Sequence, residues 1–173
     1  MSLTIFAYRT LIWMSQQESR RIPICLVPDE ILPPKEQPFI RSELDERGWL
    51  SIHEESLRSD PHSALSPDGH LQGRHWHAEY PVYSAAYEIL TALPHPQDGH
   101  LSGAHDAFDA SHCDPVLNRN FSEDEIHGGA RLLHQEEHIL AVKTQSEFLS
   151  RLELTSVGAE VRNEQRVPGL QQG

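Results

Sequence analysis

The composition of residues 56–120 limits what this chain can fold into more than any other feature. Ser, Asp, Pro, Gly and His dominate the segment, and between positions 56 and 73 its only apolar residues are Leu57, Ala64, Leu65 and Leu71. A segment so poor in apolar side chains buries too little surface to offset the entropy of ordering its backbone. We therefore expect residues 56–120 to form a loop region, of which residues 56–73 are disordered.

One short helix is expected inside this region, at residues 83–93. Val82, Ala86, Ile89 and Leu93 recur at intervals that place them on one helix face, and Pro94 follows them. After this helix the turn-forming residues return as far as Asn120.

An eight-residue phrase occurs twice in the loop region, at Asp68–His75 and again at Asp98–His105, with six of eight positions identical. Each copy begins with Asp-Gly, which favours a turn because glycine adopts positive φ at no steric cost. The copies and an adjacent residue supply candidate ligands for zinc, nickel or copper, which accept imidazole: His70, His75, His77, His100 and His105. The alternative, which the sequence favours, is a duplicated loop with solvated histidines, because no apolar residues that would impose order accompany the ligands.

The best-specified element is an amphipathic helix predicted over residues 121–154. Ser122 and Glu125 form a capping box, and Phe121 with Ile126 is placed as a hydrophobic staple. One face of the predicted helix is apolar, formed by Ile126, Ala130, Leu133, Leu140, Ala141 and Phe148. Gly128 and Gly129 each cost roughly 1 kcal/mol relative to alanine, so Ala130 is an alternative start.

The strongest candidate for chemistry lies on this helix, where residues 134–138 match the zinc-peptidase pattern H-x-x-E-H. On a helix, His134 and His138 would project from one face and could both bind Zn²⁺, with Glu137 as a candidate base for the bound water. Against this, three fixed positions arise easily in a chain rich in His and Glu. A third ligand would have to come from the 35 residues that follow, where Glu147, Glu153, Glu160 and Glu164 are available.

The remaining segments complete a prediction of a mainly α protein with extensive irregular chain. In the N-terminal segment, residues 1–55, the run at 3–14 fits a strand or a short helix, and Ile22–Val27 fits a short strand. These would make a small β element near the N-terminus, followed by a Pro-rich loop at 28–38. Residues 155–173 are expected to be a flexible tail.

The net charge and the apolar run near the N-terminus limit which classes of partner this chain can bind. A formal net charge of −12 argues against nucleic acid and anionic membranes. The apolar run at 3–14 is shorter than the ~20 residues that cross a bilayer, and it lacks the flanks of a signal peptide. We expect a cytoplasmic protein with no membrane partner, in which Cys25 and Cys113 are buried thiols.

Three hypotheses for the function follow. The first is a small acidic, non-enzymatic and partly disordered protein whose helix at 122–152 packs or binds a protein partner. The second is a histidine-rich metal-binding protein. An extension of this hypothesis is a zinc hydrolase that uses the H-x-x-E-H pattern at 134–138, with Glu137 as the base. The third is a reading frame not selected for folding, because propensity, pattern and turn chemistry agree only in the last helix. An enzymatic role stays open, although the sequence favours a protein without one.

Overall fold

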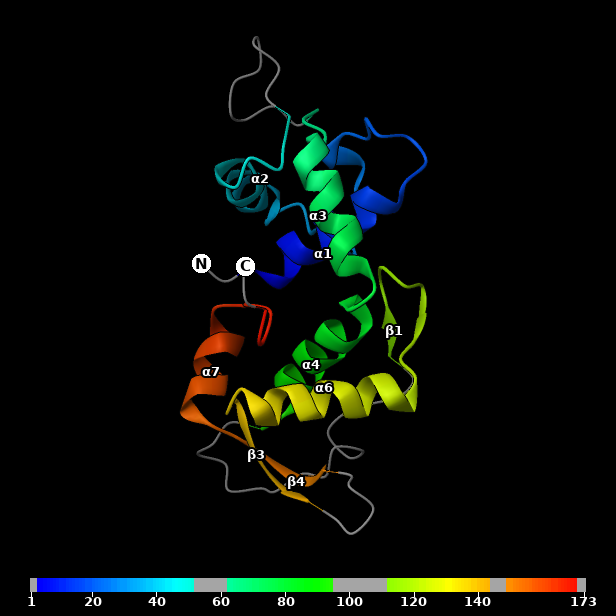
Figure 1. Ribbon diagram of the computed structural model, residues 1–173. Coiled ribbons are helices and arrows are strands. Elements are labelled where there is room, and N and C mark those ends of the chain that lie inside the picture. The colour runs from blue at the N-terminus through cyan, green and yellow to red at the C-terminus, as the bar shows by residue number, and fades with distance from the viewer. Residues whose placement is uncertain (1–2, 52–61, 95–111, 144–148, 171–173) are drawn as a thin grey trace. The chain divides into compact units, whose positions relative to one another are not determined.

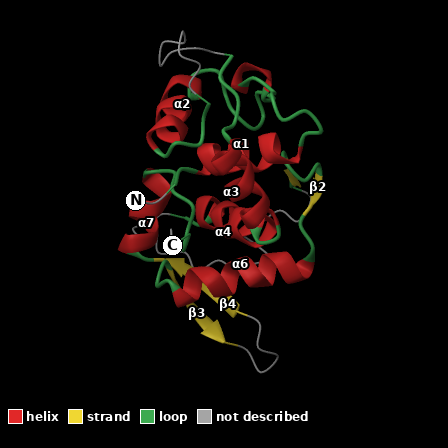
Figure 2. Cartoon of the chain, turned by 45° about the horizontal axis from the view of Figure 1, so that its top comes forward, coloured by secondary structure: helices red, strands yellow, loops and turns green. Residues whose placement is uncertain are grey.

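The computed structural model describes residues 3–51, 62–94, 112–143 and 149–170. These residues contain six α-helices, one short 3-10 helix and two small antiparallel sheets (Figures 1 and 2). The predicted mainly α class is therefore confirmed at this level. The chain divides into two compact units, Phe6–Tyr80 and the combination of Met1–Ile5 with Pro81–Gly173.

The unit Phe6–Tyr80 is built from helices. Helix α1 begins one residue before it, and the elements are α1 (Ile5–Gln16), a 3-10 helix (Ile24–Leu26), α2 (Gln37–Glu46) and α3 (Pro67–His77). Residues 3–14 form a helix rather than a strand. Its side chains are buried nearly all round, as in Tyr8 and Leu11, which is typical of a helix enclosed in a core.

The short strand expected at Ile22–Val27 is wrong, because these residues form a 3-10 turn. The amide of Val27 donates to the carbonyl of Ile24 (3.2 Å), and the amide of Ile24 donates to the carbonyl of Ser63 (2.8 Å). The Pro-rich segment forms turns up to residue 36, and α2 begins at Gln37. Gly48, at φ +72°, follows the end of α2.

Helix α3 occupies residues that the sequence assigned to a loop, and the first repeated phrase lies within it. Ser66 caps the helix by accepting from the amide of Gly69 (3.1 Å). A side chain at Gly69 would collide with the carbonyl of Trp49, and a Cβ at Gly73 would lie 2.5 Å from Cβ of Ser15. Gly69, which indicated a turn, and Gly73 instead let α3 approach its neighbours closely.

Aromatic side chains fill the core beside α3. The rings of Tyr8 and Trp76 lie 5.8 Å apart, and those of Trp49 and Trp76 lie 5.6 Å apart at nearly a right angle. Tyr80 is fully buried 5.4 Å from Tyr8. Such tilted arrangements are favourable for aromatic rings.

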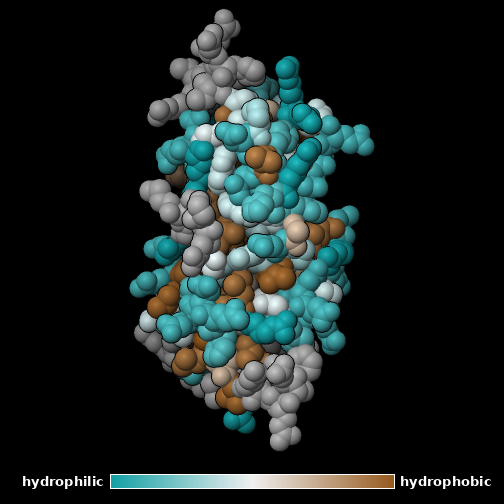
Figure 3. All heavy atoms as spheres, in the orientation of Figure 1, coloured by the Kyte–Doolittle hydropathy of each residue, from teal (hydrophilic) through white to brown (hydrophobic). Residues whose placement is uncertain are grey.

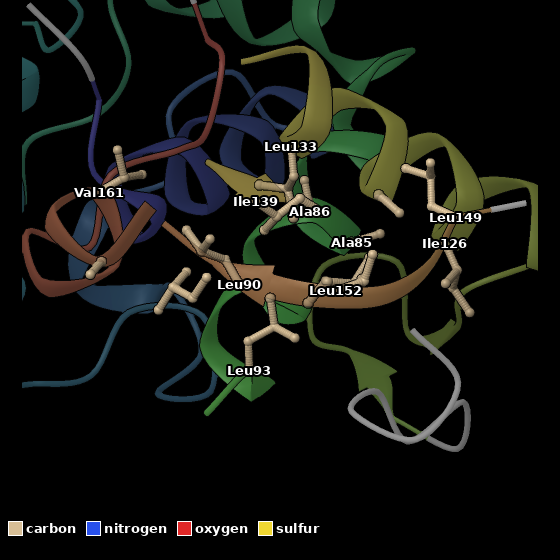
Figure 4. Close-up of a cluster of buried hydrophobic side chains, with 14 of the residues drawn as sticks. Ala85, Ala86, Leu90, Leu93, Ile126, Leu133, Ile139, Leu149, Leu152 and Val161 are labelled. Atoms are coloured by element: carbon tan, nitrogen blue, oxygen red, sulfur yellow. The ribbon is translucent and has the colours of Figure 1, made fainter. Parts of the chain in front are cut away.

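The second unit combines helices with two antiparallel hairpins. Its elements are α4 (Tyr80–Ala92, beginning one residue before it), β1 (Cys113–Asp114), β2 (Arg119–Asn120), α6 (Glu123–Gln135), β3 (Ile139–Lys143), β4 (Leu149–Leu154) and α7 (Ser156–Asn163). Helix α4 covers residues 83–92 of the short helix expected at 83–93, and it starts earlier, at Tyr80. Figure 4 shows Leu90 of α4, Leu133 of α6 and Leu152 of β4 pointing into one cluster.

The long helix predicted over 121–154 is wrong beyond Gln135. Its start is as expected, since the Ser122 hydroxyl accepts from the Glu125 amide (3.3 Å) and the Glu125 carboxylate accepts from the Ser122 amide (2.8 Å). At Glu137 the backbone turns to φ +59°, and the chain continues as the β3–β4 hairpin. Ile139 is buried there while Leu140 is 59% exposed, so the apolar pattern follows a strand.

The expected flexible tail is ordered as far as Leu170. Thr155 caps α7 by accepting from the amide of Gly158 (3.0 Å), and Val161 is buried. The amide of Val167 donates to the carbonyl of Leu3 (2.9 Å). The β element expected near the N-terminus is, in the part of the chain that the structure describes, an isolated bridge between Thr4 and Arg166. The two sheets lie later in the sequence.

No helix in the described ranges combines the length and apolar character that crossing a bilayer requires. Hydrophilic side chains cover most of the visible surface in Figure 3, and hydrophobic ones emerge at separate places. The large exposed apolar residues are Leu26, Phe39, Leu71, Leu140, Val142 and Val157. Because α6 ends at Gln135, the partner-binding helix expected at 122–152 is not formed as a single helix.

Candidate functional site: a cationic cavity

The helical zinc dyad expected at residues 134–138 is not formed. His134 lies exposed in the last turn of α6, and Glu137 is exposed beyond the helix end. His138 follows the left-handed turn and is only 8% exposed, so the two imidazoles do not share one helix face. Burial lowers the pKa of His138; the nearby charge of Glu136 raises this pKa and that of Arg166 lowers it, so the net shift is downward.

The histidines of the repeated phrase are partly described. His75 and His77 are exposed on α3, while His70 is half-buried, with Nε2 2.9 Å from the carbonyl oxygen of Arg20. His100 and His105 lie outside the described residues. Within those that are described, no group of three or more His, Cys, Asp or Glu side chains is placed to hold a metal ion. Metal binding by the whole chain stays a prediction.

Among the predicted ligands, His70 takes part in a different site, a cavity of about 490 Å³ in the unit Phe6–Tyr80. Four short segments form its walls. The lining residues are Arg20, Arg21, Ser51, His62, Ala64, Leu65, Pro67, His70, Leu71 and Arg74. The wall is mixed, with five cationic or titratable side chains beside aliphatic ones.

Backbone pairing holds one side of this cavity in place. The amide of Ser51 donates to the carbonyl of Ala64 (2.8 Å), and the amide of Ser66 donates to the carbonyl of Trp49 (2.9 Å). This short antiparallel contact leads directly into α3, which contributes His70 and Arg74 to the wall. The start of α3 is therefore held in place by this backbone pairing.

The turn after α1 provides positive charges on the other side of the cavity. Arg20 and Arg21 follow the end of α1, and the His70 contact to the Arg20 carbonyl joins this turn to α3. That contact uses the backbone of Arg20 and leaves its guanidinium group available. The close packing of Gly73 against α1 brings Arg74 into the same wall.

The described lining carries positive charge without a compensating acid. It contains three arginines, two histidines and neither aspartate nor glutamate. In the part of the chain that the structure describes, the guanidinium groups of Arg20, Arg21 and Arg74 form no ion pair. A positive wall in a chain of net charge −12 is therefore a local feature that the whole-chain charge conceals.

Sequence reasoning missed this cavity because its residues come from separate segments. The only signal was Arg20-Arg21, the single adjacent pair among otherwise scattered arginines. It also missed the state of the thiols, since Cys25 is half-buried and Cys113 is exposed rather than buried. Comparison with protein families, with curated proteins and with solved structures finds no match to this chain.

Proposed function

We propose that this chain is a small, non-enzymatic binding protein whose cavity takes an organic anion with a carboxylate or phosphate group. One observation carries the proposal: Arg20, Arg21 and Arg74 line a cavity without a carboxylate partner in its described wall. Guanidinium groups bind carboxylates and phosphates through paired, charge-assisted hydrogen bonds. The anion would supply the counter-charge that the described lining lacks.

The size and the mixed wall define the ligand further. A volume of about 490 Å³ lies within the ~300–1,000 Å³ common for small-molecule sites. Ala64, Leu65 and Leu71 offer an apolar surface beside the charges. We therefore expect an anion with an apolar body rather than a bare inorganic ion.

The test is calorimetric titration with three aromatic compounds of similar size: phenyl phosphate, phenylacetate and the neutral phenylacetamide. Both anions should bind more tightly than the amide, and their ranking distinguishes a phosphate site from a carboxylate site. Arg74→Gln should weaken anion binding by about tenfold or more, since a hydrogen bond to a charged group contributes ~1.5–3 kcal/mol. Affinity for the amide should be unchanged.

A matched control is Arg131→Gln, which removes the same charge from an exposed position on α6. It should leave binding unchanged, which separates the cavity from a general effect of net charge. Added salt should weaken the anions and not the amide. Equal affinity for phenylacetate and phenylacetamide, or equal loss in both variants, would refute the proposal.

Metal binding is the remaining alternative, and it has a direct test. Zinc or nickel retained in stoichiometric amount after dialysis of the untagged protein would support it. Because the described residues bring no three ligands together, this alternative relies on residues beyond them.

A further inference from the structure

Cys25 lies beside an imidazole that belongs to the cavity wall. Its Sγ is 4.0 Å from Nδ1 of His62, and His62 lines the cavity. The hydrogen bond from the Ile24 amide to the Ser63 carbonyl holds the two segments together. The pairing is therefore fixed by the backbone as well as by the two side chains.

This arrangement joins a nucleophile, a base and a set of cations. The thiolate is the reactive form of cysteine, and an adjacent imidazole can accept the thiol proton. The three arginines of the wall attract an anionic reagent and raise its local concentration. A neutral reagent gains nothing from those charges.

Cys113 provides a contrasting thiol within the same chain. It is exposed, and its Sγ contacts the carbonyl of Asp114 at 3.9 Å. The neighbouring imidazole of His112 has its Nε2 3.6 Å from the carboxylate of Glu88. Cys113 is thus an accessible cysteine outside the cationic wall.

We infer that Cys25 is a modification site that exchanges with small anionic disulfides drawn into the cavity. The thiolate attacks one sulfur of the reagent, a new Cys25 sulfur–sulfur bond forms, and the bond within the reagent breaks. Its other half leaves as a thiolate and takes the proton that His62 had accepted. One thiol and one disulfide give one mixed disulfide and one thiol, so no further oxidant is needed. The inference rests on the proposed anion-binding function of the cavity.

The test compares two disulfide reagents whose reaction with a thiol releases a light-absorbing product. One is the dianionic dithiobis(nitrobenzoate) and the other is the neutral dithiodipyridine. Cys113→Ser reports Cys25 alone, and Cys25→Ser reports Cys113 alone. The ratio of the anionic to the neutral rate constant should be at least about tenfold higher for Cys25, in the range that charged clefts give. Arg74→Gln in the Cys113→Ser background should reduce this ratio towards that of Cys113.

A second variant tests the imidazole. His62→Gln in the Cys113→Ser background should slow both reagents by about tenfold while circular dichroism shows an unchanged fold. Phenyl phosphate should slow only the anionic reagent at Cys25. Equal reagent ratios for the two cysteines, or an unchanged rate in His62→Gln, would overturn the inference. If phenyl phosphate or phenylacetate binds and the reagent ratios are equal, the inference fails alone. If neither anion binds or competes, the proposed function fails as well.

Discussion

Two adjacent glycines on α6 should respond oppositely to the same substitution. A Cβ at Gly129 would lie 2.7 Å from the amide nitrogen of Ala86 and 3.1 Å from the carbonyl carbon of Ala85, both in the backbone of α4. A Cβ at Gly128 would meet only methyl groups of Val82, at 3.3 and 3.4 Å. Because backbone atoms of a packed helix cannot move separately, only the first contact forces the helices apart.

The magnitudes follow from two opposing effects. Alanine in place of glycine stabilises a helix interior by roughly 1 kcal/mol. Overpacking a close contact costs about 1–3 kcal/mol, and separating α6 from α4 also loosens buried neighbours such as Leu133. The gain in helix propensity offsets part of this cost, so we expect Gly129→Ala to lower the free energy of unfolding by up to about 2 kcal/mol. Gly128→Ala should change it by about 0 to 1 kcal/mol, in the stabilising direction.

The assay must report the unit that contains α6. Trp13, Trp49 and Trp76 all lie in Phe6–Tyr80, so tryptophan fluorescence does not report it directly. Urea unfolding by far-ultraviolet circular dichroism, with hydrogen exchange of the α6 amides, gives the required free energies. Ala86→Gly should not rescue Gly129→Ala, because the contact is with backbone atoms. If both alanine variants are equally stabilised, the close helix crossing is refuted.

Three further predictions concern titration and metal. The hydrogen bond from Arg119 lowers the pKa of Glu125 from 4.5 to about 2. Glu125 therefore contributes stability above pH 4.5 that is lost towards pH 2. In urea titrations, Glu125→Gln should reduce the change in the free energy of unfolding between pH 4.5 and pH 2. Burial lowers the pKa of His138 from 6.5, so stability should fall as the pH drops below 6.5; an equal slope in His138→Gln would contradict this. Replacing His134 and His138 together by alanine should leave any zinc binding measured by calorimetry unchanged, and its abolition would restore the motif hypothesis.

The sequence predicts those elements whose signals are local. The capping box of Ser122 and Glu125 forms as expected, because its partners are three residues apart and need no tertiary context. The spacing of Ala86, Ile89 and Leu93 is likewise a sufficient signal for α4, and all three side chains are buried. The alternative start at Ala130 is wrong, because Gly129 lies where α6 and α4 meet and glycine is needed there.

The elements that were missed depend on packing between distant segments. The Asp68-Gly69 pair favours a turn when considered alone, yet Gly69 and Gly73 both sit where α3 contacts other chain segments closely. Leu140 fits the helical period of α6, but the left-handed turn at Glu137 places it on a strand. A non-glycine residue at positive φ gives no signal that sequence reasoning can use.

The distribution of partners among the arginines is what makes the cavity informative. The chain has 26 acidic residues against 14 basic ones, so an arginine on its surface has many carboxylates available. Elsewhere several arginines take one, as in the pairs Arg47–Glu43, Arg119–Glu125 and Arg166–Glu164. Isolated surface ion pairs contribute only ~0–1 kcal/mol to the free energy of unfolding. The stability gained from ion pairs therefore does not by itself explain where the arginines of this chain lie. Three arginines that share one concave wall, with no acid in its described lining, therefore support the proposed anion site, and the amide control decides whether an anion binds.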